Sequence, residues 1–358
     1  MMSLVLKLIH IMKNKQIPWL CLTLVVGLLG GCSAPRLGQQ PSIQRLVIPV
    51  EEAHTRAVPL STFHTLIRTN AGDPVVRVGS WNIEHLGGSS KRSGIARGVE
   101  QSADALADYI EFSRVDVLGL VEIYGNSAGG SKNRVLDRTF AVLNANGGAN
   151  WKYLLFDRGN RQLTGVAWNE KVVHQTGPVH RVEFGPGAPT TGPAGNRIWD
   201  RHPHVVKFSY ARQTNMTDFA VIVLHMKADY RGDFSDHREV EARLLARAFP
   251  VIRQRIDQDL VLIGDANCKN HQEAAVRAYE DARLRDLNHA DAATHWQYGP
   301  LDRAFVPEDQ PEFAGATLTV IRQNYLHDQH IQEADFKRNY SDHFMIVLPV
   351  KVMRDDDP

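Results

Sequence analysis

The sequence predicts an α/β fold in which two β-sheets pack face to face and helices cover their outer surfaces. Two observations favour this class. From residue 75 onward, strand-like segments alternate with segments of helical periodicity. The strand-like segments outnumber the helical ones, as expected when two sheets form the core. We find no internal repeat in the sequence.

The N-terminus is typical of a secreted protein. Lys13 and Lys15 precede the apolar run "IPWLCLTLVVGLLGGC", which is short for a membrane span. Its end, "LLGGC", resembles a bacterial lipobox, in which cleavage leaves Cys32 as a lipid-modified first residue. We therefore expect residues 1–31 to be a lipoprotein signal peptide and Cys32 to anchor the protein without spanning the membrane. Ser33 in place of Asp favours the outer membrane of a bacterial cell envelope.

Composition divides the remaining chain into three parts. Residues 32–69 are rich in Pro, Gln and Thr and lack sustained periodicity, which predicts a tether. The length of residues 70–352 alone allows one large domain or two small ones, and residues 353–358 are expected to form an acidic tail.

Hydrophobic periodicity predicts the elements of the domain in chain order. The β-branched run "VVRVGSWNI" predicts a strand, and the continuous apolar run "VDVLGLVEI" predicts a strand buried on both faces. "FGPGAPTTGPAG" predicts a surface loop. The predicted helices span residues 99–112, 134–148 and 234–256. The predicted strands span residues 75–83, 115–123, 151–156, 164–169, 204–210, 218–226, 259–267 and 342–352, and "PLDRAFV" is a further candidate.

Charge argues against a tight DNA-binding protein, and cysteine content excludes a disulfide-stabilised one. The formal net charge is +1, and removal of the signal peptide with its three lysines makes the mature chain slightly acidic. A large basic field for tight DNA binding is therefore absent, which still permits an enzyme that touches a few phosphates. Cys268 has no partner once Cys21 is removed and Cys32 is acylated, so no disulfide framework is possible.

Polar residues follow or interrupt several of the apolar strands. Each alone has a structural explanation: Asp265 and Asn267 in "GDAN" suit a turn, and a lone histidine is commonly a hydrogen-bonded core residue. Together they favour one site, because polar groups at strand ends on one rim converge. The set comprises Asn82, Glu84, Glu122, His225, Asp265, Asn267, Asp302, Asp342 and His343.

The ordered motifs "WNIE", "VEI", "TGVAW", "RHPHVVKF", "VLHMK", "GDAN", "LDRAFV" and "SDHF" resemble the endonuclease/exonuclease/phosphatase superfamily. The likeness is closest to its deoxyribonuclease I-like branch and spans about residues 75–350. It implies a four-layer α/β sandwich, with two mixed β-sheets packed face to face and helices outside. It also implies a metal-dependent phosphodiester hydrolase, most similar to an endonuclease acting on DNA or RNA.

The resemblance implies a divalent-metal site. Glu122 would be the principal ligand, with Asn82, Glu84 and Asp342 near the metal or the phosphate. A hard cation suits carboxylate and amide oxygens, so we expect Mg²⁺, with Mn²⁺ or Ca²⁺ as alternatives. Zinc is disfavoured because no His/Cys cluster has its ligand spacing.

The resemblance also implies acid–base roles, which imidazole fills well near neutral pH. Asp302 would orient His343, and Asp265 would polarise the attacking water together with His343. His225 is assigned as the acid, although the sequence leaves open which histidine protonates the leaving oxygen. The substrate phosphate would be contacted by Asn267 and Arg201.

The chain departs from the family pattern at three points. Ala266 stands where an aromatic residue is usual between Asp265 and Asn267. The acidic partner of the first histidine is replaced near Gln162, which puts the efficiency of His225 in doubt. The disulfides of animal relatives have no counterpart.

Two alternatives stay open. A sphingomyelinase-like enzyme would use the same chemistry on lipid headgroups, but the chain lacks an exposed aromatic run for entering a bilayer. The short cluster "THWQYGP" is expected to pack near the site instead. A non-catalytic envelope protein would have lost charged site residues that are present here. We expect a monomer whose partners are a nucleic-acid substrate and, through Cys32, a membrane.

Overall fold

The computed structural model describes residues 43–48, 74–88, 99–125, 131–145, 149–157, 162–193 and 195–356. The predicted signal peptide, Cys32 and most of the predicted tether lie outside these residues. Within the described part of the chain, no helix combines the length and the hydrophobicity that crossing a membrane requires.

Two β-sheets form the centre of the domain, as predicted. The strands of the first sheet, in spatial order, are β1 (Ile43–Ile48), β6 (Val173–Phe184), β7 (His204–Tyr210), β8 (Asp218–His225), β9 (Leu260–Asp265), β11 (Asp302–Pro307) and β10 (Leu284–Asp286). Those of the second sheet are β12 (Thr319–Val320), β13 (Ile346–Lys351), β2 (Val75–Leu86), β3 (Val117–Ile123), β5 (Leu163–Asn169) and β4 (Trp151–Leu155). Both sheets are mixed, because most of their strand pairs are antiparallel while β8–β9 and β2–β3 are parallel.

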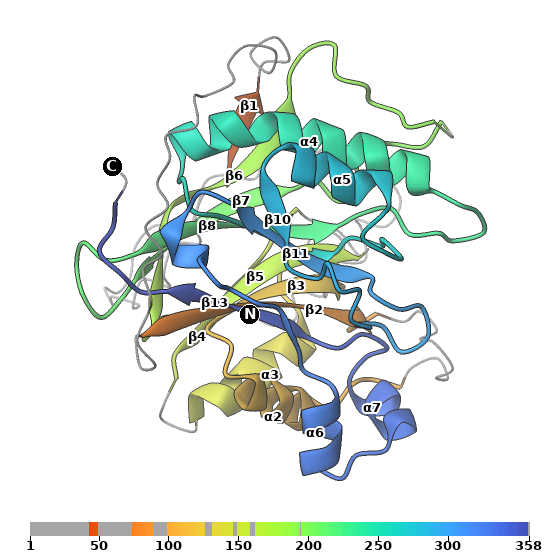
Figure 1. Ribbon diagram of the computed structural model, residues 1–358. Coiled ribbons are helices and arrows are strands. Elements are labelled where there is room, and N and C mark those ends of the chain that lie inside the picture. The colour runs from red at the N-terminus through yellow and green to blue at the C-terminus, as the bar shows by residue number, and fades with distance from the viewer. Residues whose placement is uncertain are drawn as a thin grey trace, which may run out of the picture. The chain divides into compact units, whose positions relative to one another are not determined.

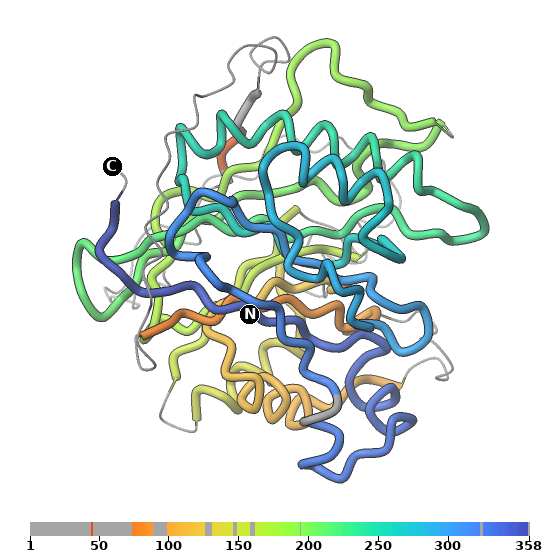
Figure 2. Tube along the Cα trace, viewed as in Figure 1, coloured from red at the N-terminus to blue at the C-terminus, as the bar shows by residue number. Residues whose placement is uncertain are grey.

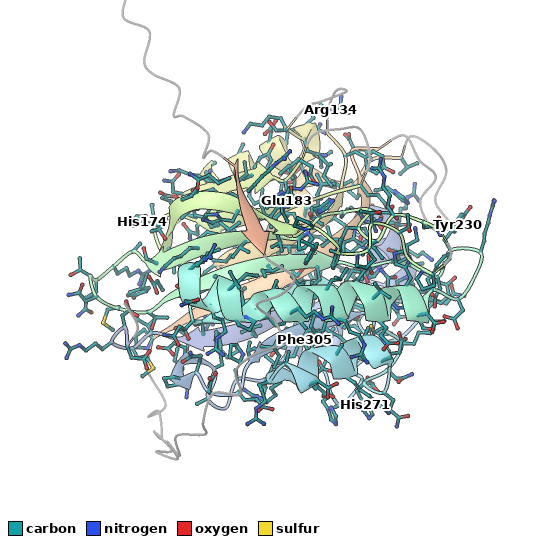
Figure 3. All side chains as sticks on the ribbon, turned by 90° about the horizontal axis from the view of Figure 1, so that it is seen from above. Arg134, His174, Glu183, Tyr230, His271 and Phe305 are labelled. Atoms are coloured by element: carbon teal, nitrogen blue, oxygen red, sulfur yellow. The ribbon has the colours of Figure 1, made fainter. Side chains whose placement is uncertain are left out.

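Helices cover the outer face of each sheet, which completes the four layers (Figure 1). The first sheet is covered by α4 (Ser235–Arg255) and α5 (Ala274–Asp281). The second is covered by α2 (Ala103–Ser113) and α3 (Arg134–Ala145), with α6 (Gln323–Asp328) and α7 (Glu333–Asn339) beside them. A 3₁₀ turn, η2, spans Pro311–Phe313. Phe305, labelled in Figure 3, packs on Tyr279 of α5 with ring centroids 4.7 Å apart.

Three apolar cores separate the layers. One lies between the sheets and is built from alternate residues of both, such as Val121 of β3 and Ile263 of β9. The other two lie between each sheet and its helices. Burial on both faces explains why β3 and β9 are continuous apolar runs in the sequence.

Parallel pairing brings the functional ends of the strands together. A crossover through α2 joins β2 to the parallel β3, and a crossover through α4 joins β8 to the parallel β9. The C-terminal strand β13 returns to pair antiparallel with β2, which Figure 2 shows as a blue strand beside an orange one. The carboxyl ends of β2, β3, β8 and β9 therefore carry the polar residues that follow these runs.

One strand lies where the sequence predicts a tether. β1 falls within residues 32–69 and forms one edge of the first sheet, where it pairs in parallel with β6 over six residues. Backbone pairing with an open sheet edge can hold a segment that has little apolar periodicity of its own.

Candidate active site

Strand register sets the predicted site residues side by side. His225 and Asp265 are the last residues of β8 and β9 and are direct partners across that pair. Asp302 opposes Asp265 from the first position of β11. Asn82 of β2 reaches the same point from the other sheet, since its Nδ2 donates to Asp265 Oδ2 at 2.9 Å. The predicted convergence of strand ends is therefore present.

His343 and Asp302 form a buried pair. His343 Nδ1 lies 2.8 Å from Asp302 Oδ2, which leaves Nε2 facing Asn82 Nδ2 at 3.4 Å and Asp265 Oδ2 at 4.0 Å. Ser341 Oγ accepts the backbone N–H of His343 and donates to the carbonyl of Asn82. Burial opposes a charged ring, but the carboxylates of Asp302 and Asp265 outweigh it and raise the pKa of His343 well above its usual value.

Asp265 is crowded by negative charge. Burial raises its pKa, the neighbouring Asp302 and Glu122 raise it further, and His343 and Asn82 partly offset this, so that the pKa of Asp265 is about 7. The backbone N–H of Asn267 donates to Asp265 Oδ1 at 3.0 Å. Asn267 has a left-handed backbone, with φ at +52°, and its Nδ2 donates to the carbonyl of Met226. "GDAN" is thus both a turn and part of the site.

His225 has the opposite electrostatic setting. Arg201 Nε donates to its Nδ1 at 2.9 Å, and the guanidinium Nη2 contacts Nε2 of the same ring. Glu122 Oε1 lies 3.8 Å from Nε2. Burial and the positive charge of Arg201 lower the pKa of His225 well below its usual value. In this arrangement the proton is held on His343 and the ring of His225 is neutral.

A second histidine, His85, lies beside Glu122 and was not predicted. Its backbone N–H donates to Glu122 Oε2 at 3.1 Å, and its Nδ1 lies 3.1 Å from the hydroxyl of Tyr124. Gln162 Nε2 lies 3.4 Å from the same Nδ1. Gln162, which stands near the position of the acidic partner in the family pattern, therefore contacts His85, whereas Arg201 contacts His225.

The backbone is strained where β2 and β3 end. Glu84, His85 and Glu122 have φ values of +30°, +56° and +63°, which side-chain-bearing residues rarely adopt. The register of β2 against β3 shifts between Asn82 and Leu86. The bulge turns Glu122 toward His225 and His85, while the buried Glu84 donates its backbone N–H to Asn82 Oδ1.

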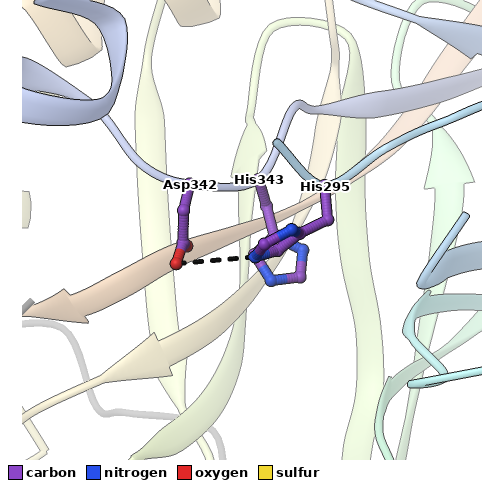
Figure 4. A group of neighbouring side chains, drawn as sticks. All are labelled: His295, Asp342 and His343. Carbon is purple, nitrogen blue, oxygen red and sulfur yellow. Dashed lines mark ion pairs between the residues drawn. The ribbon is translucent and has the colours of Figure 1, made fainter. Parts of the chain in front are cut away.

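His295 is a further residue of the site that was not predicted (Figure 4). His295 Nε2 lies 3.6 Å from Asp342 Oδ2, and its ring stands perpendicular to that of His343 with centroids 4.6 Å apart. Burial opposes the charged carboxyl, but His295 and His343 lower the pKa of Asp342 to about 2. The cluster "THWQYGP" does pack near the site, as expected, although its spacing did not single out the histidine.

The donor set fits a hard divalent cation. Glu122 and Asp342 offer carboxylate oxygens and Asn82 an amide oxygen, and the buried negative charge around Asp265 is what such an ion would neutralise. In the described part of the chain, two groups of three candidate ligand atoms lie within 4.8 Å of one another: His295 with Asp342 and His343, and Asp259 with Glu312 and Asp356. Glu122 is in neither group.

Comparison with known proteins supports the fold. A model of the Endonuclease/Exonuclease/phosphatase family matches residues 79–343. No curated protein sequence matches the chain significantly. Among solved structures, the human Nocturnin catalytic domain with bound sulfate is 15% identical, with 78% of this chain and 96% of that chain covered and a TM-score of 0.51.

Two structures from Bacteroides thetaiotaomicron are similar to the same degree. An endonuclease/exonuclease/phosphatase family protein is 16% identical, with 79% of this chain and 99% of that chain covered and a TM-score of 0.53. A mannosyl-6-phosphatase is 14% identical, with 78% and 99% covered and a TM-score of 0.50. At such identities the likeness concerns the fold alone.

Proposed function

Since the chain belongs to the endonuclease/exonuclease/phosphatase family, we propose that it is a metal-dependent phosphodiesterase, a deoxyribonuclease I-like endonuclease that cleaves DNA or RNA at the bacterial cell envelope. Members of this family are generally hydrolases of phosphoester bonds, and they typically depend on a divalent metal ion. We propose three further points: the substrate is a nucleic acid, the ion is Mg²⁺ and the protein is located at the envelope.

The observation that carries the proposal is the pairing of two buried histidines with opposite surroundings. His343 is backed by Asp302, and His225 lies between Arg201 and Glu122. Hydrolysis of a phosphodiester needs one group to accept a proton from water and another to donate one to the leaving oxygen. A protonated and a neutral imidazole, both beside Asp265 or Glu122, can divide this work.

The residues have distinct proposed roles. Glu122, Asn82 and Asp342 would hold Mg²⁺, which when bound neutralises charge on the phosphate. Asp265 would orient the attacking water. Arg201 would turn from His225 to the phosphate, because a guanidinium binds phosphate oxygens bidentately. Its departure would remove one of the two causes that keep His225 neutral, burial being the other, and the proposed role of His225 as the acid requires that His225 then takes up a proton.

A substrate panel tests the proposal. Full-length protein stripped with EDTA and then supplied with Mg²⁺, Mn²⁺ or Ca²⁺ should cleave plasmid DNA or RNA, and His225→Ala should abolish cleavage without lowering the melting temperature. Sphingomyelin vesicles and a sugar monophosphate are the other two substrates of the panel. The sugar monophosphate is included because one structural neighbour is a mannosyl-6-phosphatase. Cleavage of either of these, with both nucleic acids left intact, would replace the endonuclease proposal.

A further inference from the structure

His295 lies in a tight hairpin that precedes β11. The backbone N–H groups of Thr294 and His295 both donate to the carbonyl of Gly299, and an isolated β-bridge joins His295 to His343. Only 5% of His295 is exposed. The hairpin therefore holds this imidazole rigidly against the site rather than presenting it to solvent.

Two backbone amides fix which ring nitrogen of His295 carries the proton. The N–H groups of Gln297 and Tyr298 each donate to Nδ1 at 2.9 Å. A nitrogen that accepts hydrogen bonds must present its lone pair, so the proton of the neutral ring is on Nε2. The ring of Tyr298 stacks on the imidazole, with centroids 4.7 Å apart.

The protonated Nε2 faces the carboxylate of Asp342. The two side chains lie 3.6 Å apart between Nε2 and Oδ2, and Figure 4 shows the pair beside His343. Among the described residues, His295 is the one side chain within ion-pair distance of Asp342. The side chain of Asp342 is 12% exposed, so water can reach only a small part of it, and the N–H of His295 faces it at ion-pair distance.

The same tautomer argues against metal ligation by His295. Its three-residue group with Asp342 and His343 has ligand-like spacing. However, a histidine that binds a metal through Nε2 must donate a proton from Nδ1 to a carbonyl, a carboxylate or water. Here Nδ1 meets two donors instead. The three residues have the spacing of a metal site, but His295 carries its proton on the nitrogen that would have to bind the metal.

We propose that His295 is a positioning residue whose fixed tautomer points a protonated Nε2 at the carboxylate of Asp342 and orients it electrostatically, and that His295 is not a ligand of the metal. The claim about Asp342 rests on the proposed function, in which that carboxylate serves the metal or the phosphate. The assignment of the tautomer of His295 does not depend on the proposed function.

Nitrogen NMR of the metal-free protein, labelled with ¹⁵N-histidine, tests the tautomer without any substrate. The expected result is a protonated Nε2 and an unprotonated Nδ1 for His295, with both shifts retained when Mg²⁺ or Zn²⁺ is added. A proton on Nδ1, or a metal-induced shift of Nε2 typical of ligation, would overturn the proposal. Because no turnover is needed, this outcome is independent of whether the protein is a nuclease.

Matched substitutions test the positioning role. In His295→Asn the side-chain oxygen can still accept the two amides, as in an Asx turn, but no donor reaches Asp342. We expect a normal melting temperature and a loss of about 10- to 100-fold in kcat/KM, the usual effect of removing an outer partner of a ligating carboxylate. His295→Gln, which restores a donor at the reach of Nε2, should recover part of that loss.

The double variant with Asp342→Asn supplies the decisive comparison. If His295 acts through Asp342, adding His295→Asn to Asp342→Asn should reduce activity no further. Fully additive losses, or a His295→Asn variant as active as the unaltered protein, would contradict the positioning role.

Discussion

His225 and His343 are both buried at the same rim, yet their surroundings drive their pKa values in opposite directions. Burial favours the neutral form of both rings. At His343 the carboxylate of Asp302 outweighs burial and raises the pKa, whereas at His225 the guanidinium of Arg201 adds to the effect of burial and lowers the pKa. The sequence could indicate both histidines because each stands next to a β-branched strand in a recognisable order. It could not indicate their charges, because Arg201 meets His225 only through the fold.

Replacing Asp302 with Asn tests the pairing at His343. The amide keeps the shape of the side chain but removes the charge that favours the protonated ring, so the pKa of His343 should fall. We expect kcat to drop by about 10²- to 10⁴-fold, the range attributed to general acid–base groups. Steady-state kinetics across pH measure it, and an unaltered pH profile would contradict the role of Asp302.

The raised pKa of Asp265 makes folding stability depend on pH. Its folded value of about 7 lies above the ordinary value of 3.8, so the folded state binds this proton more tightly than the unfolded state does. The resulting stabilisation is present below about pH 4 and is lost as pH rises to about 7.

Asp265→Asn removes this dependence. Relative to the variant, the unaltered protein in EDTA should lose a few kcal/mol of unfolding free energy between pH 4.5 and 7.5, since each pKa unit is worth about 1.4 kcal/mol. Urea denaturation at both pH values provides the measurement. If the difference in unfolding free energy between the two proteins stays constant with pH, the pKa of Asp265 is not raised in the folded state.

At the scale of elements, the predictions succeed where an apolar run is continuous and fail where it is broken. Strands β2, β3, β8 and β9 and helix α4 lie within a few residues of their predicted ranges. β6 was missed because Gly177 and Pro178 interrupt it and indicate a turn, whereas in the structure the register merely shifts there. The short elements α5, β10, α6 and α7 are held by tertiary packing that a local pattern does not reveal.

Gly264, within "GDAN", sets the spacing of β8 and β9. Its φ is +147°, and a Cβ placed on it would meet the carbonyl oxygen of Leu224 at 2.3 Å. Gly264→Ala should therefore push the two strands apart at His225 and Asp265, costing at least about 2 kcal/mol and most of the activity.

Gly177→Ala is the matched control for that change. Gly177 also has a positive φ, at +65°, but a Cβ there would have no atom within 4 Å. Backbone strain alone should cost about 1 kcal/mol and leave turnover intact. Thermal unfolding and kinetics of both variants separate the effects, and equal behaviour of the pair would refute the close-approach argument.

At the scale of the whole molecule, the site exists only where two sheets meet. One sheet supplies Asn82 and Glu122, the other supplies His225, Asp265 and Asp302, and loops far apart in the chain add the rest. The family order of motifs made this meeting predictable. His85 and His295 belong to no such motif, so they emerge only from the three-dimensional arrangement.

The proposed location is tested separately from the chemistry. If Cys32 is acylated, radiolabelled palmitate should enter the full-length protein, and Cys32→Ala should abolish labelling and release the protein from membranes. Equal labelling of both proteins would sink the lipid anchor and leave the active-site proposal untouched.

The most direct test of the central claim is the initial rate of plasmid nicking in Mg²⁺ by the unaltered protein and by His343→Ala. The account predicts a rate that vanishes in EDTA and falls by at least about 100-fold in the variant, while the circular dichroism spectrum shows that the variant remains folded at the assay temperature. Nicking that survives His343→Ala, or that persists without a divalent ion, would contradict it.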